Sequence, residues 1–107
     1  MALHNLTDEK FEKDVLNSGA ISCVQFSATW CNPCRILKPI MTKISDEMSD
    51  EIKFFYMDID SQPNTASRLA IRGVPTLIVF DKQGEVLAKK VGATTEANVL
   101  AWLKSLI

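Results

Sequence analysis

Residues 21–40 read ISCVQFSATWCNPCRILKPI, and this stretch decides the fold because a strand pattern runs directly into a helix pattern. Apart from Gln25, residues 21–26 are apolar or small, and they include β-branched Ile21 and Val24, which is typical of a short buried strand. After Cys31, apolar side chains recur every three or four positions as far as Met48, which predicts an amphipathic helix. A strand followed at once by a helix is the building unit of an α/β protein.

The rest of the chain continues this alternation. Helices are expected from Thr7, a plausible N-cap, to near Gly19, and over residues 62–71, with Gly73 closing the second one. Strands are expected at 52–59, 76–80 and 85–91, the last two joined as a hairpin, before a C-terminal helix capped by Thr94 or Thr95. The predicted order is βαβαβαββα, in which a central mixed β-sheet has helices on both faces.

Length and composition limit the classes of function. A chain of 107 residues fits a single domain, 1–107, and its formal net charge of -1 does not favour nucleic acid or anionic lipid as a partner. The N-terminus shows no signal-peptide pattern, and apolar runs such as residues 77–80 are far too short to span a membrane. Three cysteines, an odd number, favour a reducing compartment. We therefore predict a cytoplasmic protein.

The segment Trp30-Cys31-Asn32-Pro33-Cys34 carries the chemistry. Its two cysteines are three positions apart at a strand-to-helix junction, the arrangement of a dithiol redox motif. Cys31 is expected to be exposed at the helix start, where free N–H groups and the helix dipole favour a thiolate, with Cys34 one turn deeper. The alternative is half of a zinc site, but structural zinc generally needs four ligands and no second pair of cysteines exists.

The chain resembles the thioredoxin family over essentially its whole length. The matching residues are spread along the sequence: Phe26, Ala28, Trp30, Cys31, Pro33, Cys34, Pro39, Asp60, Gly73, Pro75, Thr76, Gly84 and Gly92. The resemblance implies the thioredoxin fold and a protein-disulfide reductase with Cys31 as nucleophile and Cys34 as resolving cysteine. It also implies a cis peptide bond before Pro75, and a substrate site shaped by Trp30, Asn32, Pro33, Val74, Pro75 and Gly92.

The same resemblance implies partners. These are disulfide-containing proteins and a flavin-containing thioredoxin reductase, fed by NADPH, which restores the dithiol. No bound cofactor, metal, nucleic acid or membrane is expected, and the electron carrier is expected to be a monomer. Two alternatives stay open: a less reducing dithiol that works as an oxidase or isomerase, and a non-catalytic module that binds a partner.

Four positions depart from the family pattern. Gln25 and Tyr56 stand where thioredoxins commonly have a buried aspartate and a neighbouring lysine, Asn32 replaces the usual glycine, and Ser27 replaces a common tryptophan. A buried carboxylate can accept the proton of the resolving thiol, so its loss leaves two alternatives for removing the Cys34 proton: water, or the Cys31 sulfur as it leaves. Losing that negative charge also predicts a Cys31 thiolate that forms more readily than in relatives with the aspartate.

Other chemically active side chains have simpler interpretations. Cys23 lies in a predicted buried strand and is interpreted as a small apolar residue rather than a third redox thiol. His4, the only histidine, is expected at the surface or a sheet edge, without a catalytic role. Trp30 either fills a gap or flanks the site, which we favour, whereas Trp102 is expected in the core. Asp58 and Asp60 are interpreted as solvated charges.

Overall fold

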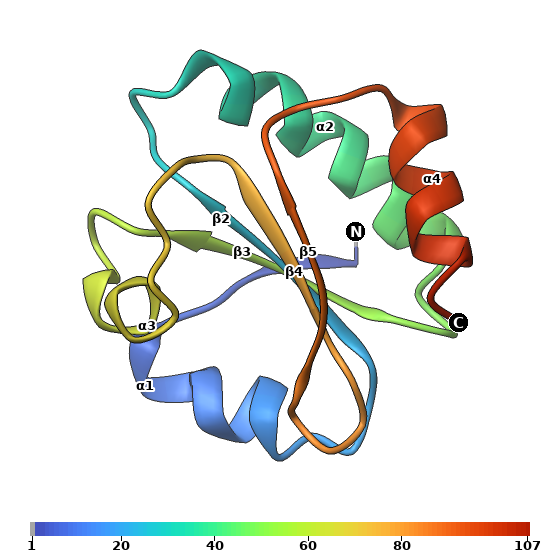
Figure 1. The fold of residues 1–107 in the computed structure, drawn as a ribbon, viewed down its shortest axis with the longest axis horizontal. Helices are drawn as coiled ribbons and strands as arrows, with labels where there is room; N and C mark the ends of the chain where they lie inside the picture. The colour runs from blue at the N-terminus through green and yellow to red at the C-terminus, as the bar shows by residue number, and fades with distance from the viewer. Residues whose placement is uncertain (1) are drawn as a thin grey trace.

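The computed structural model describes residues 2–107, which form one mixed β-sheet between two pairs of helices (Figure 1). The strands are β1 (Leu3–Asn5), β2 (Ser22–Ser27), β3 (Lys53–Asp58), β4 (Thr76–Phe80) and β5 (Val86–Val91). The helices are α1 (Asp8–Phe11), its π-helical continuation η1 (Glu12–Leu16), α2 (Asn32–Glu47), α3 (Pro63–Arg68) and α4 (Glu96–Lys104). The predicted order βαβαβαββα is confirmed, and its first strand is β1.

The five strands lie in the order β1-β3-β2-β4-β5. β1 and β2 pair in parallel with β3, whereas β4 is antiparallel to both β2 and β5. Parallel neighbours require a crossover, and α2 provides it between β2 and β3. The antiparallel pair β4–β5 needs only the short turn at 81–84, so the predicted hairpin is confirmed.

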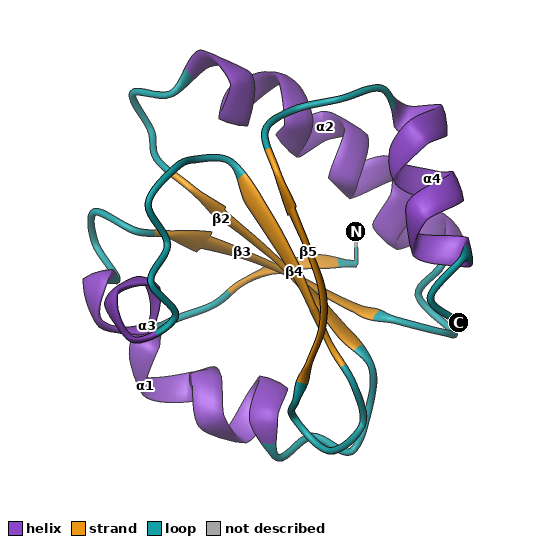
Figure 2. Cartoon of the chain, in the orientation of Figure 1, coloured by secondary structure: helices purple, strands orange, loops and turns teal. Residues whose placement is uncertain are grey.

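Each face of the sheet is covered by two helices. α2 and α4 lie on one side of the strands, and α1 and α3 lie on the other (Figure 2). Because successive strand residues point to opposite faces, Cys23 packs under α2 and α4 while its neighbour Val24 packs under α1 and α3. The sheet therefore separates two apolar clusters, and alternate residues of β2 point toward α2.

The first helix begins as predicted and ends earlier than predicted. The Thr7 hydroxyl accepts a hydrogen bond from the backbone N–H of Lys10 at 3.3 Å, which confirms the N-cap. The expected end near Gly19 is wrong, because η1 stops at Leu16. The Ser18 hydroxyl donates to the carbonyl oxygen of Val15 at 3.2 Å, so a side chain gives this carbonyl in the last turn its hydrogen bond.

The helix α3 is also shorter than the predicted 62–71, since it ends at Arg68 rather than at Ile71. The N–H of Ile71 donates to the carbonyl oxygen of Ala66, and the N–H of Ala70 donates to that of Ser67. This pair of bonds is a Schellman C-cap, whose left-handed residue here is Ala70, with φ of 56°. Sequence reasoning missed this end because alanine rarely adopts that conformation.

The C-terminal helix α4 is capped by Thr95, as predicted, and its Val99 and Leu103 are fully buried. Trp102 is half-buried and packs against the core cluster under α2 and α4, so it lies at the edge of the core in which it was expected. Lys90 of β5 extends over the Trp102 ring, with its Nζ 5.7 Å from the ring centroid. Among the residues that the structure describes, no helix has the length and apolar character needed to cross a membrane.

Candidate active site

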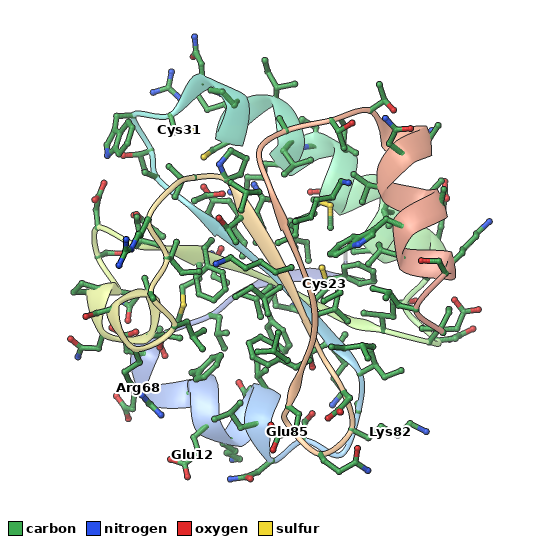
Figure 3. The ribbon with its side chains drawn as sticks, viewed as in Figure 1. Glu12, Cys23, Cys31, Arg68, Lys82 and Glu85 are labelled. Carbon is green, nitrogen blue, oxygen red and sulfur yellow. The ribbon has the colours of Figure 1, made fainter. Side chains whose placement is uncertain are left out.

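Cys31 lies at the end of the loop that follows β2 and is the N-cap of α2, as predicted (Figure 3). Its Sγ accepts a hydrogen bond from the backbone N–H of Cys34 at 3.3 Å. That N–H has no partner within the helix, and the N-terminal end of a helix dipole attracts negative charge. A thiolate at this sulfur would therefore be stabilised by the backbone of α2.

The two cysteines are more deeply buried than the sequence predicts. Only 5% of Cys31 and 1% of Cys34 is exposed, so the expectation of an exposed Cys31 is wrong. The two cysteines form a small cluster with Ala28, and Ile59 and Val74 pack against it. These two residues come from the loops after β3 and before β4, and only the folded chain brings them over the sulfurs. The Cys31 thiol faces the carbonyl oxygen of Val74 at 3.7 Å.

Burial raises the pKa of the Cys34 thiol, and its hydrogen bond with Cys31 raises it further. Hydrogen bonds from the backbone of Ala28 and from the Ser27 hydroxyl act in the opposite direction without cancelling the increase. Cys34 therefore holds its proton more firmly than a free thiol does. Another group must remove this proton before Cys34 can act as a nucleophile.

Trp30, Asn32 and Pro33 form the outer side of the dithiol. Trp30 is 67% exposed, and its indole N–H donates to Oδ2 of Asp60 at 2.9 Å. Asn32 and Pro33 are exposed in the first turn of α2. A ring this exposed does not fill a gap in the core, so that interpretation of Trp30 is wrong. Asp60 instead holds the ring in place, a contact that sequence reasoning missed.

The loop before β4 approaches the dithiol from the opposite side. The Val74–Pro75 peptide bond is cis, which confirms what the family resemblance implies. The carbonyl oxygen of Pro75 accepts a hydrogen bond from the N–H of Gly92 at 2.8 Å, which joins this loop to the end of β5. The fold thus places Val74 against the Cys31 sulfur and ties the next residue, Pro75, to Gly92 at the end of β5.

A shallow groove of about 230 Å³ runs beside the dithiol. It is lined by Trp30, Ile59, Ile71, Arg72, Gly73 and Val74. Its Ile59 and Val74 are the residues that pack against the two cysteines. A peptide in this groove would therefore pass close to the Cys31 sulfur, between an exposed indole ring and the backbone of the 73–74 segment.

Under α2 lies a group of polar side chains in place of the ionisable pair common in the family. Gln25 and Tyr56 are partners across β2 and β3, and Gln25 is fully buried. The Gln25 Nε2 donates to Oγ of Ser27 at 2.8 Å and to the carbonyl oxygen of Cys34 at 3.4 Å. Burial raises the pKa of Tyr56, and the charge of Cys34 raises it further. Nζ of Lys38 lies 4.1 Å from the centroid of the Tyr56 ring.

The remaining candidates lie away from the dithiol. Cys23 is 1% exposed within β2, and burial raises the pKa of its thiol to about 12, as expected of an inert structural cysteine (Figure 3). His4 is exposed on β1, an edge strand, which confirms its expected position. Within residues 2–107, no three His, Cys, Asp or Glu side chains gather closely enough to hold a metal ion.

Two cysteines separated by one helical turn can exchange with a substrate disulfide when one caps the helix and the other, in its first turn, is held protonated. The fold and this site define a dithiol oxidoreductase of the thioredoxin-fold class. Comparison with known proteins agrees: the family model described as thioredoxin matches residues 2–105. The chain belongs to the thioredoxin family.

Curated relatives match almost the full length of the chain. A thioredoxin from Acidithiobacillus ferridurans is 43% identical over 104 residues, which are 97% of this chain and 95% of the relative. A thioredoxin from Buchnera aphidicola subsp. Acyrthosiphon pisum is 46% identical over 98 residues, 92% of this chain and 90% of the relative. One from Rickettsia prowazekii is 39% identical over 105 residues, 98% of this chain and 99% of the relative.

These relatives and the Cys31–Cys34 pair identify a thiol:disulfide oxidoreductase of the protein-disulfide reductase type. Neither alternative, the oxidase or isomerase and the non-catalytic binding module, is favoured by the comparisons. The predicted fold class is confirmed as well, since the family match and the mixed five-stranded sheet agree.

Proposed function

We propose that Cys31 is the nucleophile and Cys34 the resolving cysteine in the reduction of protein disulfides. The Cys31 thiolate attacks one sulfur of the substrate disulfide, and the other substrate sulfur leaves as a thiolate. Cys34, once deprotonated, attacks Cys31 Sγ, which forms the internal disulfide and releases the second substrate thiolate. The single observation that carries this assignment is the hydrogen bond from the Cys34 N–H to Cys31 Sγ at 3.3 Å.

The substrate site is proposed to be the groove between the tryptophan and the cis-proline loop. Its shaping residues are Trp30, Asn32, Pro33, Val74, Pro75 and Gly92. An extended peptide there would pair with the backbone of Val74 as an added strand, which demands little of the peptide's side chains. Support comes from the apolar groove of about 230 Å³ and from the 67% exposure of Trp30 beside it. Broad tolerance for substrate proteins follows from recognition through the main chain.

The proposal extends to the cellular role. The chain, as a single domain of residues 1–107 and a monomer, would carry electrons in the cytoplasm. A flavin-containing thioredoxin reductase fed by NADPH would reduce its internal disulfide. Disulfide-containing proteins would be the substrates, with no role for nucleic acid or membrane. The formal net charge of -1 and the family membership support this choice of partners.

Reduction of insulin, followed by the turbidity of its released chains, tests the roles of the cysteines. We expect Cys31→Ser to abolish turnover and Cys34→Ser to accumulate a mixed disulfide, because attack can occur but resolution cannot. Cys23→Ala is the matched control, and it should retain turnover since that thiol is buried away from the site. Equal turnover by wild type and Cys31→Ser would contradict the assignment.

A further inference from the structure

A cation at the start of α2 reaches back to the loop that precedes the helix. The Arg35 guanidinium donates through Nε to the carbonyl oxygen of Thr29 at 2.9 Å, and through Nη2 to the same oxygen at 2.5 Å. A carbonyl oxygen has two lone pairs, and the planar guanidinium offers N–H groups side by side, so one oxygen takes both bonds. Among residues 2–107, no carboxylate forms an ion pair with Arg35. The loop carbonyl is therefore the group that holds this side chain.

The Thr29 carbonyl belongs to the central peptide unit of a turn. The N–H of Cys31 donates to the carbonyl oxygen of Ala28 at 3.2 Å, which closes a turn with Thr29 and Trp30 as its central residues. In a β-turn the central peptide unit makes no hydrogen bond within the turn, and its tilt distinguishes one turn type from another. Thr29 is exposed, so without Arg35 its carbonyl would bond to water and the unit would be free to tilt.

Trp30 is consequently held at both ends. Because the peptide bond is planar, a fixed Thr29 carbonyl also fixes the backbone N–H and the Cα of Trp30. At the other end, the indole N–H donates to Oδ2 of Asp60 at 2.9 Å. Between these two contacts the residue is 67% exposed and lines the groove beside the dithiol. Packing against the core therefore contributes little to the direction of the ring, and the two hydrogen-bonded contacts set it.

We propose that Arg35 is a positioning residue, which holds the Trp30 side of the substrate groove in place by clamping the Thr29–Trp30 peptide unit. A protein substrate that lies along the groove then meets a wall that is already ordered, so less freedom is lost on binding. A small disulfide reaches Cys31 without filling the groove and does not use that wall. Loss of the clamp should therefore weaken the binding of protein substrates more than it slows attack by Cys31. This inference rests on the proposed function and its substrate groove.

The kinetics of insulin reduction test the clamp in the intact protein. Arg35→Met removes both N–H donors and should raise KM for insulin by about fivefold, with kcat changed less than about twofold, because the net contribution of hydrogen bonds corresponds to a several-fold change in an equilibrium constant. Lys38→Met is the matched control. It removes a positive charge one turn further along α2, from a side chain that extends over the Tyr56 ring, so KM should stay at the wild-type value.

Two further measurements separate the clamp from a direct effect of the Arg35 charge. The first thione released from dithiodipyridine, a small uncharged disulfide, reports attack by Cys31, and its rate should change less than about twofold in Arg35→Met. In a Trp30→Ala background, Arg35→Met should raise KM for insulin no further, because the residue through which it acts is gone. A much slower release, or an undiminished effect on KM without Trp30, would overturn the clamp, because Arg35 would then act on the sulfur or on the substrate.

Fluorescence of Trp30 reports the motion of its ring. The chain has two tryptophans, so Trp102→Phe leaves Trp30 as the single emitter. In that background, Arg35→Met should increase the amplitude of the nanosecond component of the anisotropy decay, and Lys38→Met should leave it unchanged. An anisotropy decay that Arg35→Met does not alter would also overturn the clamp.

The proposed function and the clamp fail on different results. Insulin turnover that survives Cys31→Ser would contradict the proposed function, and a wild-type KM in Trp30→Ala would contradict the proposed groove. With turnover dependent on Cys31 and KM dependent on Trp30, an unchanged KM in Arg35→Met refutes the clamp alone. Arg35 and Lys38 are exposed, so both variants should fold, and circular dichroism that matches wild type would show that lost folding is not the cause.

Discussion

The turn between β4 and β5 lies against the end of the first helix, and Gly84 permits this close approach. Its φ is +82°, and a Cβ built there would lie 2.5 Å from the carbonyl oxygen of Leu16 and 3.0 Å from its Cα. These are backbone atoms at the end of η1, which cannot turn aside as a flexible side chain can. We therefore expect Gly84→Ala to destabilise the protein clearly.

The magnitude follows from two costs. The left-handed backbone conformation costs alanine about 1 kcal/mol, and an extra methyl group in a filled site costs about 1–3 kcal/mol. Gly84→Ala should thus lower the free energy of unfolding by about 2–4 kcal/mol. Gly19 is the matched control, since its φ is +72° but nothing lies within 4 Å of an added Cβ. Gly19→Ala should cost only about 1 kcal/mol.

Urea unfolding followed by far-UV circular dichroism measures both variants under one condition. Small domains are stable by about 5–15 kcal/mol, so Gly84→Ala should still fold and give a complete transition. The slope of free energy against urea should match wild type, which would show that only stability has changed. Equal losses in the two variants would refute the reasoning, because the contact with Leu16 is the difference between them.

Three further predictions follow from individual residues. Ala70→Gly should raise the free energy of unfolding by about 0.5–1 kcal/mol in urea, because glycine adopts φ of 56° without a Cβ clash; a loss would contradict the C-cap. Burial opposes a decrease, but the Thr65 side chain and the backbone N–H groups of Thr65 and Asn64 at the start of α3 hold the pKa of Asp8 below 3.8. The stability that this lowered pKa contributes is complete above pH 3.8 and is lost as pH falls below that value. The free energies of unfolding of wild type and Asp8→Asn should therefore become equal in acid, and a difference that stays constant with pH would refute this. Gln25→Asp should move the reaction of Cys31 with iodoacetamide to higher pH, because a buried negative charge opposes the thiolate; an unchanged or lower midpoint would contradict it.

The sequence was most informative where the physics is local. Thr7 and Thr95 cap their helices as predicted, because a hydroxyl before an amphipathic pattern bonds to a backbone N–H only a few residues away. The end of α3 was not predicted, because the fold and not the local sequence sets it. Its left-handed residue is Ala70, and nothing in the local sequence marks an alanine for a conformation that the surrounding fold imposes.

The sequence by itself determined the order of helices and strands along the chain and the dithiol at the start of α2, because periodicity, capping and a two-cysteine spacing all lie within short segments. It also indicated the family, through matching residues spread along the whole chain. Only the tertiary structure decided how accessible Cys31 is and what lies beneath Cys34. Ile59, Val74 and Tyr56 reach the site from other strands and loops, and long-range packing alone sets their contacts. The burial of the sulfurs and the Gln25 amide at the Cys34 carbonyl are therefore properties of the folded chain.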